Sequence, residues 1–300
     1  EFRERFEFEY ERGMPELPEV ETVRRGLEPA LAGARLVRVE ARRPDLRFAF
    51  PDGFVQRLTG ARIERLERRG KYLIAPTDRG ESLIMHLGMT GRFTVEGQGR
   101  LVRPGDFVMA AEPDPKHAHV VFETEPGDVI TYYDPRRFGF MGLADSADLD
   151  THPWFAGMGP EPLSDAFSGA QLVAAFKNRK QGPKTLLLDQ RVVAGLGNIY
   201  VCEALHRARI SPFKPAGRIS RPRVEALVPI IKAVLAEAIE AGGSTLRDYA
   251  GADGALGYFQ HNFQVYDREG HACPRRDCSG VIARQVQAGR STFYCPVCQK

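Results

Sequence analysis

The residues best suited to covalent chemistry lie in Met14-Pro15-Glu16, at the start of an amphipathic helical pattern. A proline exposed as an N-terminus carries a secondary α-amine, and because an α-amine has an ordinary pKa of about 8, it is partly unprotonated at neutral pH. Such an amine can attack the anomeric carbon of a sugar and form an iminium, which draws electrons from neighbouring bonds. Glu16 follows directly and is placed to move protons. Taken alone, however, this stretch is better explained as a helix cap.

Four of the five cysteines lie within the last 28 residues, in two close pairs. Their spacing is C-x4-C, sixteen residues and C-x2-C, which leaves room for a β-hairpin between the pairs. Thiolates presented in this way bind a tetrahedral zinc ion at about 2.3 Å. Two disulfides are the alternative, and a reducing compartment disfavours them. We therefore predict one structural zinc site, whose binding energy folds the segment, with the ligands Cys273, Cys278, Cys295 and Cys298.

Two glycine-flanked loops carry side chains suited to entering a DNA duplex, namely His86–Gly91 (HLGMTG) and Asp134–Gly139 (DPRRFG). Methionine usually fills a core. Apolar and arginine side chains on such loops are also what a protein needs to wedge a base step and to replace an extruded base. His117 and His119 lie in KHAH, where no cysteine or acid completes a metal set, so a phosphate contact or a strand-surface role is favoured.

Three further features have both an ordinary and a functional interpretation. Lys71 starts an apolar strand and is either an edge lysine or, if it points into a cleft, a proton donor. In Gly195–Tyr200 (GLGNIY), paired glycines let the backbone approach a phosphate where a helix starts. No long βαβ unit surrounds this G-x-G, so we expect no nucleotide cofactor. The run from Lys177 to Lys184 is a basic patch or a solvated face.

The elements that must position these residues follow from periodicity. Apolar residues at steps of three and four predict a helix from Leu17 to Leu31, ended by Gly33. Short segments between turn signals then predict an antiparallel sandwich or barrel, and these segments are Leu36–Val39, Lys71–Ala75, Leu83–Leu87, His119–Phe122, Val129–Tyr133 and Phe138–Leu143. We expect the polar stretch Gly97–Pro115 to be a long loop.

The pattern becomes helical after a shift of composition at Ala144–Pro162. We predict one helix around Leu172–Phe176, capped by Ser164 and Asp165, and a longer one over Val224–Ile239, ended by Gly242-Gly243. The fold class is therefore multidomain α+β. We expect an N-terminal extension at 1–13 that is disordered or not native, a β-sandwich with a leading helix at 14–147, a helical domain at 148–262 and a β-hairpin zinc finger at 263–300.

Composition narrows the class of protein. The chain has 300 residues, 43% of them hydrophobic, and no long apolar run, which excludes a membrane span. Residues 1–13 lack the apolar core of a secretory signal, so we expect a cytoplasmic protein. A net charge of +3 permits a nucleic-acid partner without requiring one.

Taken together, these motifs closely resemble those of bacterial formamidopyrimidine-DNA glycosylases, from Met14 to Lys300. The resemblance joins PELPEVE, RGKYL, HLGMTG, KHAHV, DPRRFG, GLGNIY and GRSTFYCPVCQ in one order. It implies an N-terminal β-sandwich, a helix-two-turn-helix domain and a zinc finger. It also implies a base excision repair enzyme, expected to be a monomer, that binds damaged double-stranded DNA. As a DNA glycosylase it would remove oxidised purines, and as an AP lyase it would cleave the strand by β,δ-elimination.

The resemblance also assigns roles to individual residues. Pro15 would be the nucleophile that forms the Schiff base, Glu16 the acid that helps to open the sugar, and Lys71 and Arg290 the proton donors for β- and δ-elimination. DNA contacts would come from His117, Arg136, Arg179 and Asn198, and the void left by the flipped nucleotide would be filled by Met89, Arg136 and Phe138.

Two alternatives remain open at this point. An endonuclease VIII-like glycosylase for oxidised pyrimidines shares the nucleophile and fold, although PELPEVE and DPRRFG favour the purine branch. A non-catalytic zinc-finger DNA-binding protein is the second, because the lone pair of an acylated proline nitrogen is not free for attack. As thirteen residues and Met14 precede Pro15, we expect Met14 to be the true start, or processing to expose Pro15.

Overall fold

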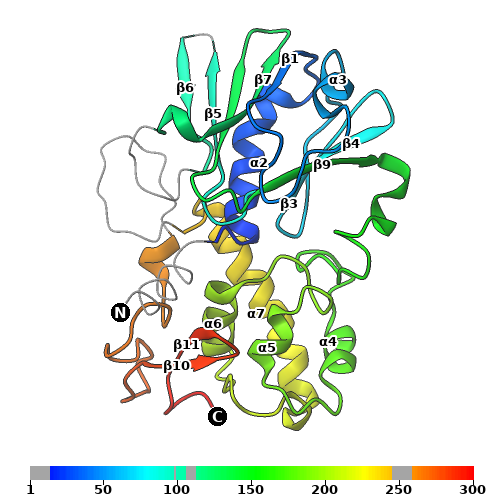
Figure 1. Cartoon of the computed structure of the whole chain (residues 1–300). Coiled ribbons are helices and arrows are strands. Elements are labelled where there is room, and N and C mark those ends of the chain that lie inside the picture. Colours follow the sequence, from blue (N-terminus) through cyan, green and yellow to red (C-terminus); the bar gives the residue numbers. More distant parts are fainter. Residues whose placement is uncertain (1–13, 98, 106–112, 245–258) are drawn as a thin grey trace. The chain divides into compact units, whose positions relative to one another are not determined.

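The computed structural model describes residues 14–97, 99–105, 113–244 and 259–300 (Figure 1). The predicted extension 1–13 and the central part of the predicted loop Gly97–Pro115 lie outside the described residues. The chain divides into two compact units. The first contains the residues up to Ala156 and the segment that starts at Gly242, and the second contains 157–241 and 259–300. The predicted domain boundaries, after residues 147 and 262, stay a prediction.

The first unit begins with helix α2, Leu17–Leu31, as predicted. Glu16 is its N-cap and forms a reciprocal capping box with Glu19, so backbone N–H groups left without helical partners are satisfied. Pro18 occupies the first turn, where a missing N–H costs nothing. The chain leaves the helix through Gly33, whose φ of +78° suits glycine.

Within the described part of this unit, nine antiparallel strands form two sheets. Both sheets lie beside α2 (Figure 1). The larger sheet has the order β1-β7-β8-β5-β6 and the smaller one the order β2-β3-β4-β9. The short helix α3, Phe54–Leu58, lies between β1 and β2 in the chain. The strands span Leu36–Ala41, Glu67–Arg69, Tyr72–Pro76, Glu81–His86, Arg92–Gly97, Arg100–Val102, Ala118–Thr124, Val129–Tyr133 and Phe140–Asp145, for β1 to β9 in turn.

A single core joins the helix to both sheets. Val20, Val23 and Leu27 of α2 pack with residues such as Phe122 of the larger sheet and Met85 of the smaller one. Burial of this apolar surface from both sheets is what holds a sandwich together. The predicted antiparallel sandwich with a leading helix is confirmed. The expectation of a loop throughout Gly97–Pro115 was wrong in part, because Arg100–Val102 pairs with β5 as strand β6.

The second unit is helical and ends in a β-hairpin. Helix α4 begins at Gly169 and is capped by the Ser168 hydroxyl, which accepts from Gln171 N, so the caps predicted at Ser164 and Asp165 were wrong. Helix α7 is followed, as predicted, by Gly242 and Gly243, both at positive φ. The unit contains α4 (Gly169–Phe176), α5 (Pro183–Leu188), α6 (Asn198–Arg207), α7 (Arg221–Glu240), β10 (Ala283–Gln287) and β11 (Arg290–Tyr294).

Short 3-10 helices connect several of these elements, at Pro115–His117, Ser146–Thr151, Ala216–Arg218 and Phe259–Asn262. Among the described residues, no helix combines the length and apolar character that a bilayer crossing requires.

Candidate functional site

Pro15 and Glu16 lie at the N-terminal end of α2, where the helix dipole favours negative charge. Pro15 is half-buried, and Glu16 is only 4% exposed. Glu19, also buried, accepts hydrogen bonds from Glu16 N at 3.0 Å and from the backbone N and hydroxyl of Ser244 at 2.8 and 2.9 Å. The Glu19 carboxylate therefore fixes the backbone next to Pro15 and holds Ser244 against the same helix end.

Lys71 lies in the turn between β2 and β3, and its side chain is only 8% exposed. Such burial is unusual for lysine, whose ammonium group prefers water. Helix α2 packs on both of these strands, and the ion pair between Glu21 Oε2 and Arg68 Nε, 3.2 Å long, joins α2 to β2. Burial raises the pKa of Glu21, but Arg24 and Arg68 lower it by more, so the net shift is downward and the carboxylate stays charged. This pair positions the Lys71 turn relative to α2.

The two glycine-flanked loops follow β4 and β8. The Arg136 guanidinium carbon lies 4.8 Å from the centre of the Phe138 ring, a cation–π contact. Arg137, between them, has a φ of +54°, which is rare for a residue with a Cβ and marks a strained turn. Met89 lies in the other loop and is only 6% exposed, so its side chain is packed away in this structure.

His117 and His119 lie where the chain enters β7. His117 is half-buried, whereas His119 is buried and its Nε2 donates to the carbonyl of Asp134 at 3.0 Å. Burial lowers the pKa of His119, so the ring is neutral at pH 7. Within the part of the chain that the structure describes, neither histidine belongs to a group that could hold a metal ion.

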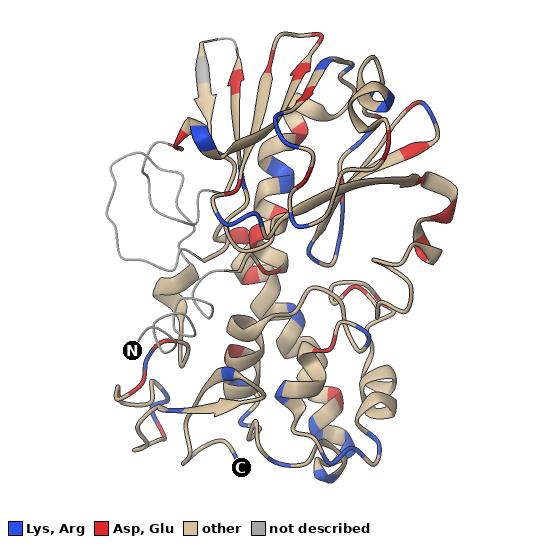
Figure 2. Cartoon of the chain, viewed as in Figure 1, with Lys and Arg blue, Asp and Glu red and all other residues tan. Residues whose placement is uncertain are grey.

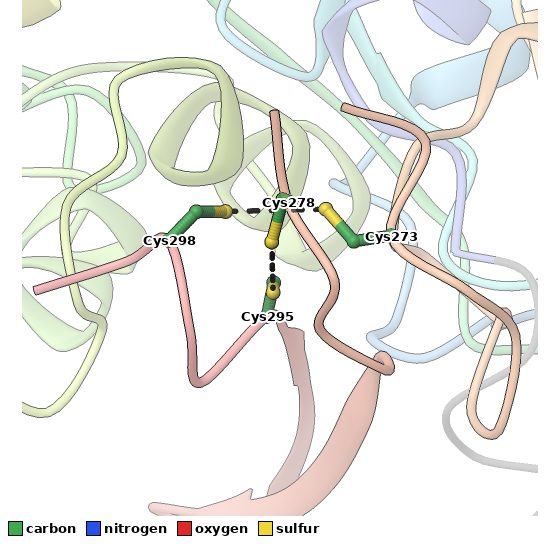
Figure 3. Close-up of side chains that lie close together, drawn as sticks. All are labelled: Cys273, Cys278, Cys295 and Cys298. Atoms are coloured by element: carbon green, nitrogen blue, oxygen red, sulfur yellow. Dashed lines mark hydrogen bonds between the residues drawn. The ribbon is translucent and has the colours of Figure 1, made fainter. Parts of the chain in front are cut away.

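The four predicted cysteine ligands converge at one point of the second unit (Figure 3). Their Sγ atoms all lie within 4.8 Å of one another, with Cys273 and Cys298 3.9 Å apart and Cys278 and Cys295 3.6 Å apart. A tetrahedral ion with Zn–S bonds of about 2.3 Å needs thiolates about 3.8 Å apart, so the arrangement fits zinc. All four positions are filled by protein ligands, which makes the site structural. The predicted zinc site is confirmed.

Residues outside the ligand set support this metal centre. Gly280 N donates to Cys278 Sγ at 3.3 Å, and a Cβ at Gly280 would lie 2.6 Å from Cys295 Sγ, so only glycine fits there. His206 Nε2 lies 3.4 Å from Cys273 Sγ. Such outer hydrogen bonds orient metal ligands.

Arg290 begins β11, directly after a two-residue turn. Ala288 and Gly289 of this turn both have positive φ, as a tight hairpin turn of the I′ type requires. The next residue is anchored from two helices, because the Ser291 carbonyl accepts from Lys184 Nζ of α5 at 2.8 Å and from Asn198 Nδ2 of α6 at 2.9 Å. Two helices of this unit therefore fix the strand that carries Arg290.

Asn198 starts α6 just after the GLGN turn. Gly195 in this turn has a φ of +79°, and its N–H donates to Gln190 Oε1 at 2.7 Å. Asn198 is 7% exposed, and its Oδ1 finds no donor among the described residues. The turn thus keeps the start of α6 in a fixed conformation.

Lys and Arg residues gather at the end of α4 and the start of α7 (Figure 2). Gly217 N donates to the Arg179 carbonyl at 3.0 Å, which brings the loops after α4 and before α7 together. Arg179 itself is exposed, as are Lys177, Lys180 and Arg218. Clustered cations of this kind bind phosphates.

Several positioning residues escaped the sequence analysis. Lys184 is 1% exposed and Nζ also donates to Thr292 Oγ1 at 2.7 Å, so it is a buried anchor and not part of a solvated basic patch. Glu203, fully buried in α6, accepts from the backbone N–H groups of residues 264, 265 and 266, each at 2.9 Å. Its position within an apolar helical run was the available signal, because a carboxylate there must have donors.

Three family models match the chain in succession. They are the formamidopyrimidine-DNA glycosylase N-terminal domain over residues 14–141, the formamidopyrimidine-DNA glycosylase H2TH domain over 158–250 and the zinc finger found in FPG and IleRS over 270–300.

Curated relatives and solved structures agree. The chain is 72% identical over 287 residues to formamidopyrimidine-DNA glycosylase of Phenylobacterium zucineum, and the match covers 96% of this chain and 100% of the relative. It is 70% identical over 286 residues to formamidopyrimidine-DNA glycosylase of a Caulobacter species, and this match covers 95% of the chain and 100% of the relative. The MutM (FPG) protein of Thermus thermophilus superposes with a TM-score of 0.79 at 41% identity, covering 95% of this chain and 98% of that one. A Lactococcus lactis FPG mutant, solved in complex with a Fapy-dG containing DNA, superposes with a TM-score of 0.81 at 35% identity. This match covers 95% of this chain and 100% of the mutant chain.

Proposed function

The chain belongs to the formamidopyrimidine-DNA glycosylase family, and from this premise we propose that it excises oxidised purines from double-stranded DNA and then cleaves the strand. The observation that carries the proposal is the joint presence, in one unit, of Pro15-Glu16 at the N-terminal end of α2 and of a buried Lys71 in the turn between two strands that pack on α2. Relatives in solved structures bind DNA that contains Fapy-dG or an abasic site.

The Pro15 nitrogen, once it is the N-terminal amine, attacks C1′ of the damaged nucleoside. The C1′–base bond breaks, the base leaves with the bonding electrons, and the Pro15 nitrogen loses its proton and stays bound to C1′ beside the ring oxygen. Glu16 then supplies a proton to the ring oxygen O4′, so the C1′–O4′ bond breaks, the sugar ring opens and C1′ becomes an iminium bound to Pro15. Its burial beside a helix N-terminus supports a role at a dry, preorganised site.

Strand cleavage uses the same intermediate. The iminium acidifies the C2′ proton, whose loss expels the 3′ phosphate in β-elimination, and a second elimination expels the 5′ phosphate. We assign Lys71 to proton transfer in the first elimination and Arg290 to the second. Burial of Lys71 and the double anchoring of the strand that carries Arg290 both support these assignments, because a proton donor must be held in place.

DNA binding is assigned to residues of both units. His117 and Arg136 belong to the first, and Arg179 and Asn198 to the second. Met89, Arg136 and Phe138 fill the space left by the extruded nucleotide, which offsets the few kcal/mol that extrusion costs. The cation–π contact of Arg136 and Phe138 supports their acting as one unit.

The decisive experiment traps the covalent intermediate. Purified protein, with its N-terminus determined by mass spectrometry, is incubated with a duplex that contains 8-oxoguanine and is then treated with sodium borohydride. We expect one adduct, mapped by peptide sequencing to Pro15. A matched protein that keeps residues 1–13 should give no adduct, because its proline nitrogen is acylated. An adduct formed by that protein would show that Pro15 is not the nucleophile.

Substrate class is tested in parallel with a duplex that contains thymine glycol. Faster cleavage of the 8-oxoguanine duplex is expected. Preference for thymine glycol would instead assign the chain to oxidised pyrimidines, and binding of damaged duplex without cleavage would leave it a DNA-binding protein only.

A further inference from the structure

Asp134 lies between β8 and β9, and its side chain is completely buried. Its Oδ1 accepts from the Thr90 hydroxyl at 2.5 Å, and its Oδ2 accepts from Gly139 N at 2.7 Å and from the Tyr132 hydroxyl at 3.3 Å. A buried carboxylate is stable only when donors satisfy its oxygens. These three donors come from two loops and one strand, so the carboxylate ties all three together.

The backbone of Asp134 reaches a third segment. Its N–H donates to the carbonyl of His117 at 3.0 Å, and its carbonyl accepts from His119 Nε2 at 3.0 Å. The same carbonyl also accepts from Arg137 N at 3.2 Å, which closes the turn that carries Arg136. One residue therefore contacts the loop of Met89, the start of β7 and the loop of Arg136 and Phe138.

The glycines of the two loops make this arrangement possible. A Cβ at Gly88, where φ is +62°, would lie 2.3 Å from Gly139 N. A Cβ at Gly91 would lie 2.3 Å from the Tyr132 hydroxyl, and one at Gly139 would lie 1.9 Å from the same hydroxyl. No side chain fits at these distances, so the loops approach each other and Asp134 only because glycine occupies these positions.

We propose that Asp134, together with Thr90, is a positioning residue that fixes the two loops carrying the void-filling residues Met89, Arg136 and Phe138 before these loops meet a duplex. This role rests on the proposed function, in which those three residues replace an extruded nucleotide. The Thr90 hydroxyl serves both loops, because it donates to Asp134 and accepts from Arg136 N at 3.3 Å.

Preorganisation is the physical reason for such a hub. A loop that is already ordered loses less conformational entropy when it enters DNA, so more of its contact energy opposes the cost of extrusion. Burial first, and then the neighbouring Asp134, raise the pKa of Tyr132 well above its ordinary range. Tyr132 therefore stays protonated and remains a donor to the carboxylate.

The test separates base extrusion from base release. Thr90→Val removes the hydroxyl and keeps the shape of the side chain, and Thr90→Ser keeps the hydroxyl as its matched control. Each is mixed with an 8-oxoguanine duplex that carries 2-aminopurine beside the lesion, whose fluorescence rises when the base stack opens. Single-turnover excision is measured on the same samples, and thermal unfolding followed through Trp154, the single tryptophan, checks that each variant is folded.

We expect Thr90→Val to slow the fluorescence rise and the excision by the same factor, about ten-fold, since one hydrogen bond to a charged group is lost. Thr90→Ser should stay within about three-fold of the wild type. Glu16→Gln, which affects the chemistry, should keep the fluorescence rise and lose excision. Should Thr90→Val not fold, Thr90→Ala is measured in its place.

Two results would overturn the role of the hub. One is a Thr90→Val protein that matches the wild type in both signals, and the other is slow excision with a normal fluorescence rise, which would place Thr90 in the chemistry. Absence of excision by a wild-type protein whose N-terminus is Pro15 would instead refute the proposed function. The fluorescence rise needs no base release, so it still decides the positioning role in that case.

Discussion

His86 makes the stability of the first unit depend on pH. It ends β4, and its Nδ1 accepts a hydrogen bond from Gly88 N at 3.0 Å, in the loop that carries Met89. Its ring stacks on Phe140, with centroids 4.9 Å apart and planes 11° apart. Protonation of Nδ1 would break the bond to Gly88. Burial first, then the charges of Lys71 and Arg47, lower the pKa of His86 to about 3.

The sign of the effect follows from proton linkage. Between about pH 3 and pH 6.5 the unfolded chain, with an ordinary histidine pKa of about 6.5, binds the proton that folded His86 refuses. Stability therefore falls as the pH drops below about 6.5. With these two pKa values, the loss between pH 7 and pH 5 is about 2 kcal/mol for this one group.

Urea titrations at pH 7 and pH 5, in which unfolding is monitored by the fluorescence of Trp154, measure this loss of stability in the first unit. Trp154 is the single tryptophan and packs on Phe140, with ring centroids 4.6 Å apart. His86→Gln is the matched variant, because its amide oxygen still accepts from Gly88 and does not titrate. The wild type should lose about 2 kcal/mol more than His86→Gln between the two pH values. Equal losses in both proteins would refute the reasoning.

Three further predictions concern the proposed activity and the metal. Glu16→Gln should slow excision, measured by single-turnover kinetics, by about 100-fold or more, because a proton donor acts on the rate of the chemical step. The dissociation constant for damaged duplex, measured by titration, should stay within a few-fold of the wild-type value. Cys295→Ser should reduce the zinc content from one ion per chain to near zero by atomic absorption and weaken DNA binding, and unchanged affinity would remove the finger from recognition. Arg179→Ala should weaken binding to damaged and undamaged duplex alike. It should also lower the slope of log affinity against log salt concentration by about 0.9 in magnitude, because one phosphate contact is lost. An unchanged slope would show that Arg179 contacts no phosphate.

Features encoded by neighbouring residues could be predicted from the sequence. The apolar period of three and four residues determined α2, and alternating turn signals determined most strands of the sandwich. Cysteine spacing determined the zinc site, because four thiolates in two tight pairs have few other uses in a reducing compartment. The cap of α4 was predicted at Ser164 and Asp165, but the helix is capped by Ser168. Several residues that can cap a helix lie close together there, and the backbone conformation in the folded protein decides which of them does so.

The tertiary structure alone decided which polar side chains hold the site together. Thr90 and Asp134 are 44 positions apart, and Glu19 and Ser244 are 225 apart. No local propensity relates such residues, because their hydrogen bonds form only after the sheets and helices have packed. The sequence by itself thus determined most of the elements, the metal ligands and the family of this protein. Burial of carboxylates such as Asp134 and Glu19, whose donors come from distant segments, decided how those elements hold the candidate site.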